Sequence, residues 1–321
     1  MYIIPFLALI AASGGNALKQ YAMKNCGKRA PGAFNSVCIN LARAVICTVV
    51  SLVFWIVAGF GSTNGVGYTS AVLGGIGNAL SLFSWIIASG FIPMSLIEIF
   101  STFGNLVAPM ILAPYIFDGD SVGALQWVGC GLLVLSVFTF IEPVRARRKS
   151  NDGIAPQADG GMSKNRNTVF MVAIVALQTV STGMAAIFQK YYNFHVFAKG
   201  QGSMEFYNLL SFCVVVAVFV IGFLCFLAFR RNGITDENGR IVLPYKSVWA
   251  FILMAGIGLY VAQYGSGIAS ELPSAIYFPL NKSAVMIETF ILDTIVFKDK
   301  FTLRRLLGVI MVIVAVVLVN I

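Results

Sequence analysis

The chain has 321 residues, of which 58% are hydrophobic and only 11% are charged. Soluble globular proteins contain about a quarter charged residues, so this composition excludes a water-soluble fold, and we expect lipid to solvate much of the surface. The formal net charge of +9 does not indicate a nucleic-acid partner, because the basic residues lie in short segments between apolar stretches, without interleaved aromatic residues.

Ten apolar stretches follow one another along the chain, and each is long enough to cross a bilayer as a helix, which takes about 20 residues. The sequence therefore predicts an all-α, polytopic membrane protein with ten transmembrane helices. The predicted spans cover residues 2–23, 34–58, 68–88, 92–116, 122–141, 168–190, 204–229, 247–269, 273–297 and 302–320.

A polar segment divides the ten spans into two sets of five. Residues 142–167 are basic and rich in glycine and proline, which is typical of a flexible linker. A second polar segment, 230–247, contains the turn signal DENG and is predicted to be a surface loop. The predicted organisation is a first five-helix repeat at 1–141, a cytoplasmic linker at 142–167 and a second five-helix repeat at 168–321.

The two sets of spans resemble each other in sequence. A shift of 168 aligns the Asn-Leu pair at 40–41 with the one at 208–209, and a shift of 181 aligns Gly-Ile-Gly at 75–77 with the same triplet at 256–258. Because five is an odd number, the second set must enter the membrane from the opposite side. This predicts an inverted-topology repeat, the architecture that many secondary transporters use for alternating access.

The charge distribution predicts the orientation of the chain. Most of the 22 lysine and arginine residues fall in loops on the side of the linker, and Lys24 is counted in the first of these loops. Only Lys190 and Lys199 fall in loops on the other side. The positive-inside rule then places the linker in the cytoplasm and both termini outside, in a multi-pass protein of the plasma membrane.

Two segments carry a resemblance to a known family. They are GGIGNALSLFSWIIASGFIPMSLIEIFSTFGNLVAPMIL in the first half and MAGIGLYVAQYGSGIASELPSAIYFPLNKSAVMIETFIL in the second. With a glycine-rich third span and a proline-led fourth span in each half, the chain resembles the EamA-like ten-helix carriers of the drug/metabolite transporter superfamily. The resemblance implies carriage of amino acids, sugars, nucleotide-linked metabolites or drugs. Arg43 matches the basic residue that this family often has in its second helix, whereas FDGD at 117–120 and FKDK at 297–300 depart from the family's glutamate.

Ionisable side chains within the predicted spans are the first candidates for function, because each costs about 2.5–3.5 kcal/mol to insert into a bilayer. The ninth span has the densest set: Asn281 and Glu288 lie close to one face, and Lys282 and Asp293 close to another. Such a helix is expected to face a water-filled cavity. Pro279 is expected to kink the helix and free backbone carbonyls beside the site.

The fourth span carries Glu98, Ser101, Thr102 and Asn105 at i, i+3, i+4 and i+7, which is a polar stripe on one helix face. The family resemblance implies that spans four and nine line the central cavity. Our hypothesis is that Glu98 and Lys282 face each other there and bind the ammonium and carboxylate groups of a zwitterion, or that Glu98 exchanges a proton with the substrate. The alternative is a buried ion pair that only fixes the helix register.

Further residues complete the predicted site. Glu288 is a candidate proton carrier, because a carboxyl group in a medium of low dielectric constant holds its proton tightly, although it could instead bond to a neighbouring helix. Asn16 and Lys19, with Gln20, could line an entry vestibule, or Lys19 could snorkel to the cytoplasmic interface, which is the interpretation we favour. The predicted substrate-binding residues are Glu98, Lys282, Asn281, Thr102, Asn105, Tyr264 and Tyr277, with Arg43 and Pro279 in structural roles.

Other classes of protein fit the sequence less well. It has one histidine and no HExxH, GxSxG or P-loop motif, so we expect neither an enzyme nor catalytic residues. Its six cysteines lack metal-ligand spacing, so we expect no metal and no cofactor. The predicted function is gradient-driven or exchange transport of an amino acid or similar zwitterion by a monomer or homodimer. The alternatives are an exporter of hydrophobic cations or drugs and a lipid-headgroup translocase.

Overall fold

The computed structural model describes residues 3–30, 32–89, 92, 96–105, 123–140, 164–197, 199–229, 243, 245–269, 284–298 and 302–319. These residues form an all-α protein, as the sequence predicts. Two helical segments at 96–105 and 284–291 accompany the longer helices. The longer elements are α1 (Ile3–Arg29), α2 (Ala33–Val57), α3 (Gly65–Ser89), α5 (Ala124–Phe140), α7 (Lys164–Tyr192), α8 (Met204–Phe229), α9 (Tyr245–Ala269) and α11 (Leu303–Val319), with π-helical turns at Asn193–Phe197 and Leu292–Val296.

Each predicted span contains one of these helical segments, and most boundaries agree within a few residues. Two boundary differences change an assignment made from the sequence. Helix α1 continues to Arg29, so Lys24 lies inside the helix rather than in a loop, which corrects its assignment. Helix α7 begins at Lys164, within the last residues assigned to the linker, and residues 142–163 of that segment lie outside the described residues.

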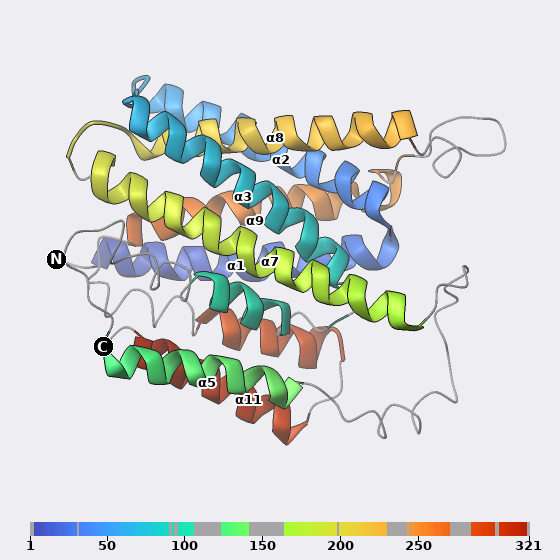
Figure 1. Cartoon of the computed structure of the whole chain (residues 1–321). Coiled ribbons are helices and arrows are strands. Elements are labelled where there is room, and N and C mark those ends of the chain that lie inside the picture. The colour runs from blue at the N-terminus through green and yellow to red at the C-terminus, as the bar shows by residue number, and fades with distance from the viewer. Residues whose placement is uncertain are drawn as a thin grey trace, which may run out of the picture.

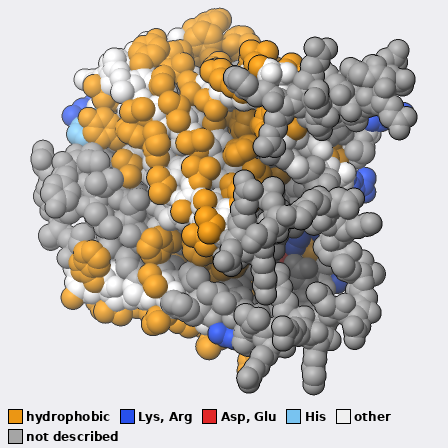
Figure 2. Space-filling view, turned by 45° about the vertical axis from the view of Figure 1, so that its right-hand side comes forward, with side chains coloured by type: hydrophobic (Ala, Val, Ile, Leu, Met, Phe, Trp, Pro, Cys, Tyr) orange, Lys and Arg blue, Asp and Glu red, His pale blue; other side chains and the backbone are white. Residues whose placement is uncertain are grey.

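The hydropathy of the helices identifies a multi-pass membrane protein. A helix of 25 residues such as α3 is about 37 Å long, and the hydrocarbon core of a bilayer is about 30 Å thick. Figure 2 shows hydrophobic side chains spread over much of one face of the molecule. Five described segments are long and apolar enough to cross a membrane: Phe34–Val57, Gly65–Ser89, Val169–Phe197, Met204–Ala228 and Val248–Ser266.

The helices pack in pairs that join the two halves of the chain. Helix α1 packs against α9, α3 against α7, α2 against α8 and α5 against α11, while α3 also contacts α8 and α2 also contacts α9. Exchanging the first five helices for the second five leaves this set of neighbours unchanged. In Figure 1, α1 runs away from the end of the bundle that holds both termini, whereas its counterpart α7 runs towards that end.

Glycines bring the two principal pairs into backbone contact. A Cβ atom added to Gly15 of α1 would lie 2.8 Å from the carbonyl oxygen of Gly258 in α9. A Cβ atom added to Gly77 of α3 would likewise lie 2.8 Å from the backbone nitrogen of Ala185 in α7. Both contacts depend on the absence of a side chain, which is the usual reason for small residues at membrane helix interfaces.

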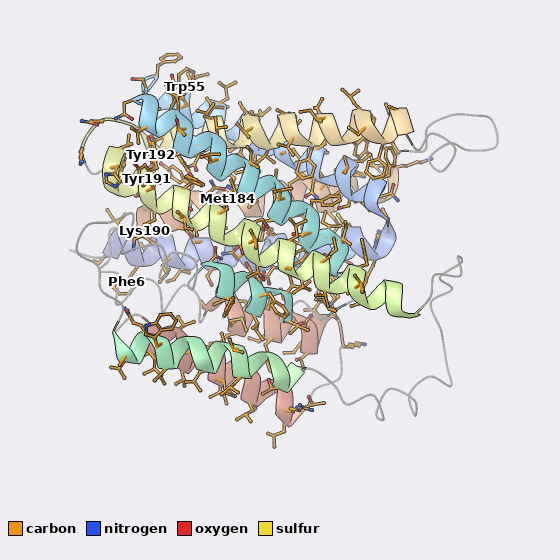
Figure 3. All side chains as sticks on the ribbon, viewed as in Figure 1. Phe6, Trp55, Met184, Lys190, Tyr191 and Tyr192 are labelled. Carbon is orange, nitrogen blue, oxygen red and sulfur yellow. The ribbon has the colours of Figure 1, made fainter. Side chains whose placement is uncertain are left out.

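The two ends of the bundle differ in charge. One end holds both termini and, as Figure 3 shows, Trp55, Lys190 and Tyr192. Here the connection between α2 and α3 meets the one before α8 through a bridge between Thr63 and Gly202. The last turn of α1, with its basic Lys28 and Arg29, lies at the opposite end. The described basic side chains are therefore concentrated at one end, as the sequence predicts.

Candidate substrate-binding cavity

A cavity of about 210 Å³ lies between helices of both halves. Its walls come from α1, α2, α3, α7, α9 and the helical segments at 96–105 and 284–291. The lining residues are Asn16, Lys19, Met23, Arg43, Asn78, Ser81, Leu82, Trp85, Glu98, Ser101, Asn105, Gln178, Gln189, Leu259, Ala262, Gln263, Ser266 and Val285.

The cavity wall is polar and charged although it lies inside an apolar protein. Among the described residues, the charged side chains on this wall are Lys19, Arg43 and Glu98, and all three belong to the first half of the chain. The described lining of the second half contributes amides and a hydroxyl group instead. Such side chains inside a membrane protein mark a water-filled site rather than a lipid-facing surface.

Glu98 is held by neutral hydrogen-bond donors. It lies on the helical segment 96–105 and is 8% exposed. Its Oε1 atom accepts hydrogen bonds from Gln20 Nε2 at 3.1 Å and from Trp85 Nε1 at 3.2 Å. These bonds orient the carboxylate at the cavity wall without neutralising its charge.

Arg43 is almost completely buried, at 2% exposure. Its Nη2 atom donates a hydrogen bond to Oδ1 of Asn40, one turn earlier in α2. Asn40 in turn donates from Nδ2 to the Leu82 carbonyl of α3 at 3.1 Å. Arg43 lines the cavity, and its Nε atom is buried without a hydrogen-bond partner among the described residues.

Lys19 also lies at the cavity, which corrects its interpretation as a snorkelling residue. Its Nζ atom donates to Asn16 Oδ1 at 2.9 Å, and both residues line the cavity. Lys19 lies within electrostatic range of Arg43, Glu98 and Glu288. Because Lys19 and Asn16 are one turn apart in α1, the helix itself directs the ammonium group towards the cavity rather than towards the end of the bundle.

Glu288 lies beside the cavity on the helical segment 284–291. Its Oε1 atom accepts a hydrogen bond from the Ser13 hydroxyl group of α1, and its Oε2 atom is buried without a partner among the described residues. Glu288 therefore links the second half to α1 and keeps one unsatisfied oxygen. This geometry is compatible with the predicted proton exchange and does not test it.

Neutral hydrogen bonds connect α3 to α7 and α9 to the neighbouring helix α8 around the cavity. Gln178 of α7 accepts a hydrogen bond from the Ser84 hydroxyl group and donates from Nε2 to Ser81 Oγ at 3.2 Å. Gln263 of α9 donates to Asn208 Oδ1 of α8 at 2.8 Å. These bonds fix amide groups on the wall without placing a charge there.

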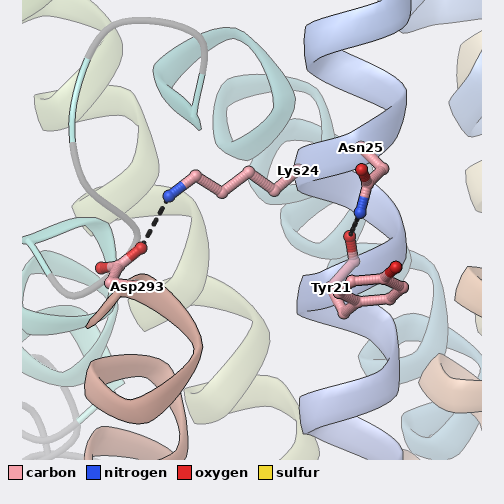
Figure 4. Close-up of polar contacts among 4 residues, drawn as sticks. All are labelled: Tyr21, Lys24, Asn25 and Asp293. Carbon is pink, nitrogen blue, oxygen red and sulfur yellow. Dashed lines mark hydrogen bonds and ion pairs between the residues drawn. The ribbon is translucent and has the colours of Figure 1, made fainter. Parts of the chain in front are cut away.

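A buried ion pair closes one end of the bundle. Lys24 Nζ of α1 lies 2.7 Å from Asp293 Oδ1 in the turn Leu292–Val296, and the two side chains are only 5% and 4% exposed (Figure 4). The Phe297 ring lies beneath the Lys24 and Lys28 ammonium groups, at 4.3 and 4.6 Å from its centroid. The cavity continues the other way, because Gln189 and Ser266 lie near the ends of α7 and α9 that face the termini.

The predicted site residues fall into three groups. Glu98 and Asn105 line the cavity. Thr102 is buried but is absent from the lining, and Tyr264 packs 5.2 Å from the ring of Phe54 instead of facing the cavity. The remaining predicted residues, Lys282, Asn281, Tyr277 and Pro279, lie outside the described residues. The pairing of Glu98 with Lys282 therefore stays a prediction.

Several residues of the cavity were not predicted from the sequence. Trp85 was not among the predicted site residues, although Asn78, Ser81 and Trp85 follow an i, i+3, i+7 pattern along α3 that indicates one helix face. Gln178 and Gln263 were overlooked because an uncharged amide in a span stands out less than a charge. Their place in the cavity depends on contacts with distant helices.

Comparison with known proteins adds information on the fold alone. No protein-family model matches the sequence, and no curated protein matches it. One solved structure, described only as the crystal structure of a protein, superposes with a TM-score of 0.59 and 15% sequence identity. The match covers 99% of this chain and 95% of that chain. The chain therefore shares its fold over nearly the full length with a protein of known structure.

Proposed function

We propose that this chain is a secondary transporter, an alternating-access carrier, for a small polar metabolite of the α-amino-acid type. The observation that carries the proposal is the polar cavity between the two halves, with Lys19, Arg43 and Glu98 on its wall. A cavity that offers both signs of charge complements a zwitterion. An uncharged or purely apolar substrate would leave these buried charges uncompensated.

The size and charge of the cavity favour a small metabolite over the alternatives. Drug-sized ligands occupy pockets of about 300–1,000 Å³, whereas this cavity measures about 210 Å³. A hydrophobic cation would meet the like charges of Lys19 and Arg43, which disfavours it by repulsion. A lipid-headgroup translocase stays the weaker alternative, since it requires a lateral opening for acyl chains.

The arrangement of helices supports an inverted repeat of the EamA-like type. The main packing pairs between the halves map onto each other when the two halves are exchanged, and α1 and α7 run in opposite directions (Figure 1). The full-length likeness to a solved structure supports a common fold and carries no information on the substrate. Inverted repeats suit alternating access because each half can adopt the conformation of the other.

The two ends of the bundle support a transport cycle. At the basic end, the pair Lys24–Asp293 joins the first half to the second, and the cavity extends towards the end with the termini. In the proposed cycle this pair separates when the cavity opens to the basic end. The positive-inside rule places that end in the cytoplasm of a cell bounded by the plasma membrane. With no P-loop in the sequence, a solute gradient or exchange would supply the energy.

The test begins with the purified full-length protein in detergent and the twenty standard amino acids. A ligand that binds the folded state at about 100 times its dissociation constant stabilises the protein by about 2.7 kcal/mol, which thermal unfolding detects. Amino acids that raise the midpoint are then tested for counterflow in proteoliposomes. We expect unlabelled substrate inside the vesicles to accelerate uptake of the labelled substrate.

The control for this assay is Lys246→Met, which changes an exposed lysine outside the cavity and is expected to transport normally. Glu98→Gln removes the negative charge from the cavity and is expected to abolish counterflow. The proposal fails if the wild-type protein shows no trans-stimulation with any ligand that it binds, since a channel would behave in that way.

A further inference from the structure

We propose that Arg43 and Lys19 form the subsite that binds the substrate carboxylate, with Glu98 facing the substrate ammonium group. This inference rests on the proposed transport function and deepens it. It gives Arg43 a direct binding role in place of the structural role that the sequence favours. It also supplies a cationic subsite from described residues, independently of Lys282.

The first argument is the incomplete neutralisation of the buried charges. The structure has one ion pair among its described residues, Lys24–Asp293, and neither Arg43 nor Lys19 takes part in it. Their described partners, Asn40 and Asn16, are neutral amides. A guanidinium group stays charged in proteins, and a buried charge without a counter-ion is costly. The carboxylate of a substrate in the cavity would give these cations a direct counter-ion, while its ammonium group would keep the overall charge of the site unchanged.

The second argument is the geometry of the donors. The guanidinium group of Arg43 uses Nη2 for Asn40, while its Nε atom is buried and has no partner among the described residues. A guanidinium group binds a carboxylate through two parallel N–H donors, which gives strong and oriented recognition. Asn40 is itself bonded to the Leu82 carbonyl, so the bond from Arg43 to Asn40 holds the guanidinium group at the wall.

The third argument is the charge balance around Lys19. Arg43, Glu98 and Glu288 all lie within electrostatic range of this lysine, so two cations and two carboxylates surround the described part of the site. A zwitterion preserves that balance. A dianion such as phosphate would face two carboxylates, and a cation without an anionic group would leave Arg43 unpaired. The substrate class that follows is a zwitterion with a free carboxylate.

The fourth argument is that the unlike charges do not neutralise each other. Gln20 and Trp85 bind the carboxylate of Glu98, while Asn16 binds the ammonium group of Lys19. Within the described part of the chain, Glu98 has no cation at ion-pair distance. The neutral partners therefore hold the opposite charges apart at one cavity wall, as a substrate with separated charges requires.

The experiment compares three ligands that differ only in their charged groups. The probes are the standard amino acid that stabilises the wild-type protein most, its α-amide and the corresponding carboxylic acid without the amino group. We expect Arg43→Met to raise the KM for the amino acid by about tenfold or more, which corresponds to about 1.4 kcal/mol or more, and to leave binding of the amide unchanged. We expect Lys19→Met to act in the same direction with a smaller effect.

Arg43→Lys keeps the charge and loses the paired donors, so it separates geometry from electrostatics. We expect its KM to lie between those of the wild type and Arg43→Met. The ligand-free melting midpoint is measured for every variant, so that a folding defect is recognised as such. Lys246→Met serves as the control and is expected to retain the wild-type preference for the amino acid over its amide.

Distinct outcomes overturn the inference and the proposed function. If folded Arg43→Met and Arg43→Lys transport the amino acid with wild-type KM, the carboxylate subsite is wrong while the carrier stands. If the wild type binds the amide as tightly as the amino acid, no carboxylate subsite exists. If inorganic phosphate competes with the amino acid more strongly than the carboxylic acid does, the subsite selects phosphate instead. If the wild-type protein shows no counterflow, the proposed function itself fails.

Discussion

The α1–α9 and α3–α7 pairs are built on the same backbone contact and carry different chemistry. A Cβ atom added to Gly15 would lie 2.8 Å from the Gly258 carbonyl oxygen, and one added to Gly77 would lie 2.8 Å from the Ala185 nitrogen. Yet α1 carries Lys19 and Lys24, whereas the side-chain hydrogen bonds described between α3 and α7 join hydroxyl and amide groups.

The two pairs therefore share their helix packing but differ in the charges that they bring to the cavity. Two alternating conformations can arise from two similar halves, so the helix contacts repeat. A zwitterion has two unlike ends, so a site that orients it cannot be symmetric. In the described part of the cavity the charges belong to the first half, and the second half supplies neutral donors and acceptors. The predictions below test this division, beginning with the largest expected effect.

The largest loss in the free energy of unfolding is expected when the Lys24–Asp293 ion pair is broken. Lys24→Met removes the described counter-ion of Asp293, and both side chains are at most 5% exposed. Removal of one partner of a buried ion pair costs about 3–5 kcal/mol. Denaturant titration in detergent micelles should therefore show a loss of this size in the free energy of unfolding.

The matching control replaces both charges. In Lys24→Met/Asp293→Leu no charge is left unpaired, so most of the lost stability should return, because apolar residues of similar volume often replace a buried ion pair without loss. A double variant as unstable as Lys24→Met alone would show that Asp293 is not the residue that makes the single substitution costly.

The glycine contacts should be equally sensitive on both sides. Gly258→Ala places a Cβ atom 2.7 Å from the Gly15 carbonyl oxygen, and Gly77→Ala places one 2.8 Å from the Ala185 nitrogen. Overpacking of this kind costs about 1–3 kcal/mol. Denaturant titration should give similar losses for the two variants, and a large difference between them would break the comparison of the two pairs.

Gly14→Ala is the control for these substitutions. A Cβ atom at Gly14 meets no atom within 4 Å, and alanine favours a helix over glycine by about 0.5–1 kcal/mol. This variant should be as stable as the wild type or slightly more stable, although it changes the residue next to Gly15. Destabilisation of Gly14→Ala would mean that glycine matters here for a reason other than close packing.

The smallest effect is expected from the neutral bonds between α3 and α7. Ser81→Ala removes the hydroxyl group that accepts a bond from Gln178 Nε2 at 3.2 Å. Hydrogen bonds between membrane helices contribute about 0.6 kcal/mol on average and at most about 1.7 kcal/mol. Thermal unfolding should show a small decrease in the midpoint, well below that of Lys24→Met. A decrease in the midpoint as large as that of Lys24→Met would contradict the difference between the charged contacts of α1 and the neutral contacts of α3 with α7.

Much of the fold follows from hydropathy, because a long apolar helix is stable in a bilayer wherever it lies in the chain. The span predicted at 204–229 has the same boundaries as α8, and those at 34–58 and 302–320 differ by about one residue from α2 and α11. Helix α1 was predicted too short because Lys24 looks like a residue outside the membrane. Its counter-ion Asp293 is 269 positions away in the chain, beyond the reach of any local pattern.

The site was predictable only where a helix face carried its own signal. The i, i+3, i+7 spacing of Glu98, Ser101 and Asn105 identified a stripe, and the structure places these residues on the cavity wall. Lys19 was misread because the same side chain can extend to an interface or bend into a cavity, and only the packing of α1 against α9 decides between them. The contact of Tyr264 with the ring of Phe54, which belongs to another helix, could not be predicted from the sequence.

The sequence alone indicated a helical membrane protein whose two halves resemble each other in sequence. These properties follow from composition and spacing, which every segment expresses locally. Only the tertiary structure decided which buried charges neutralise each other and which remain available at the cavity. Lys24 meets Asp293, whereas Lys19, Arg43 and Glu98 meet neutral groups. Electrostatic energy depends on the distance between charges in space, and the order of residues in the chain does not contain that distance.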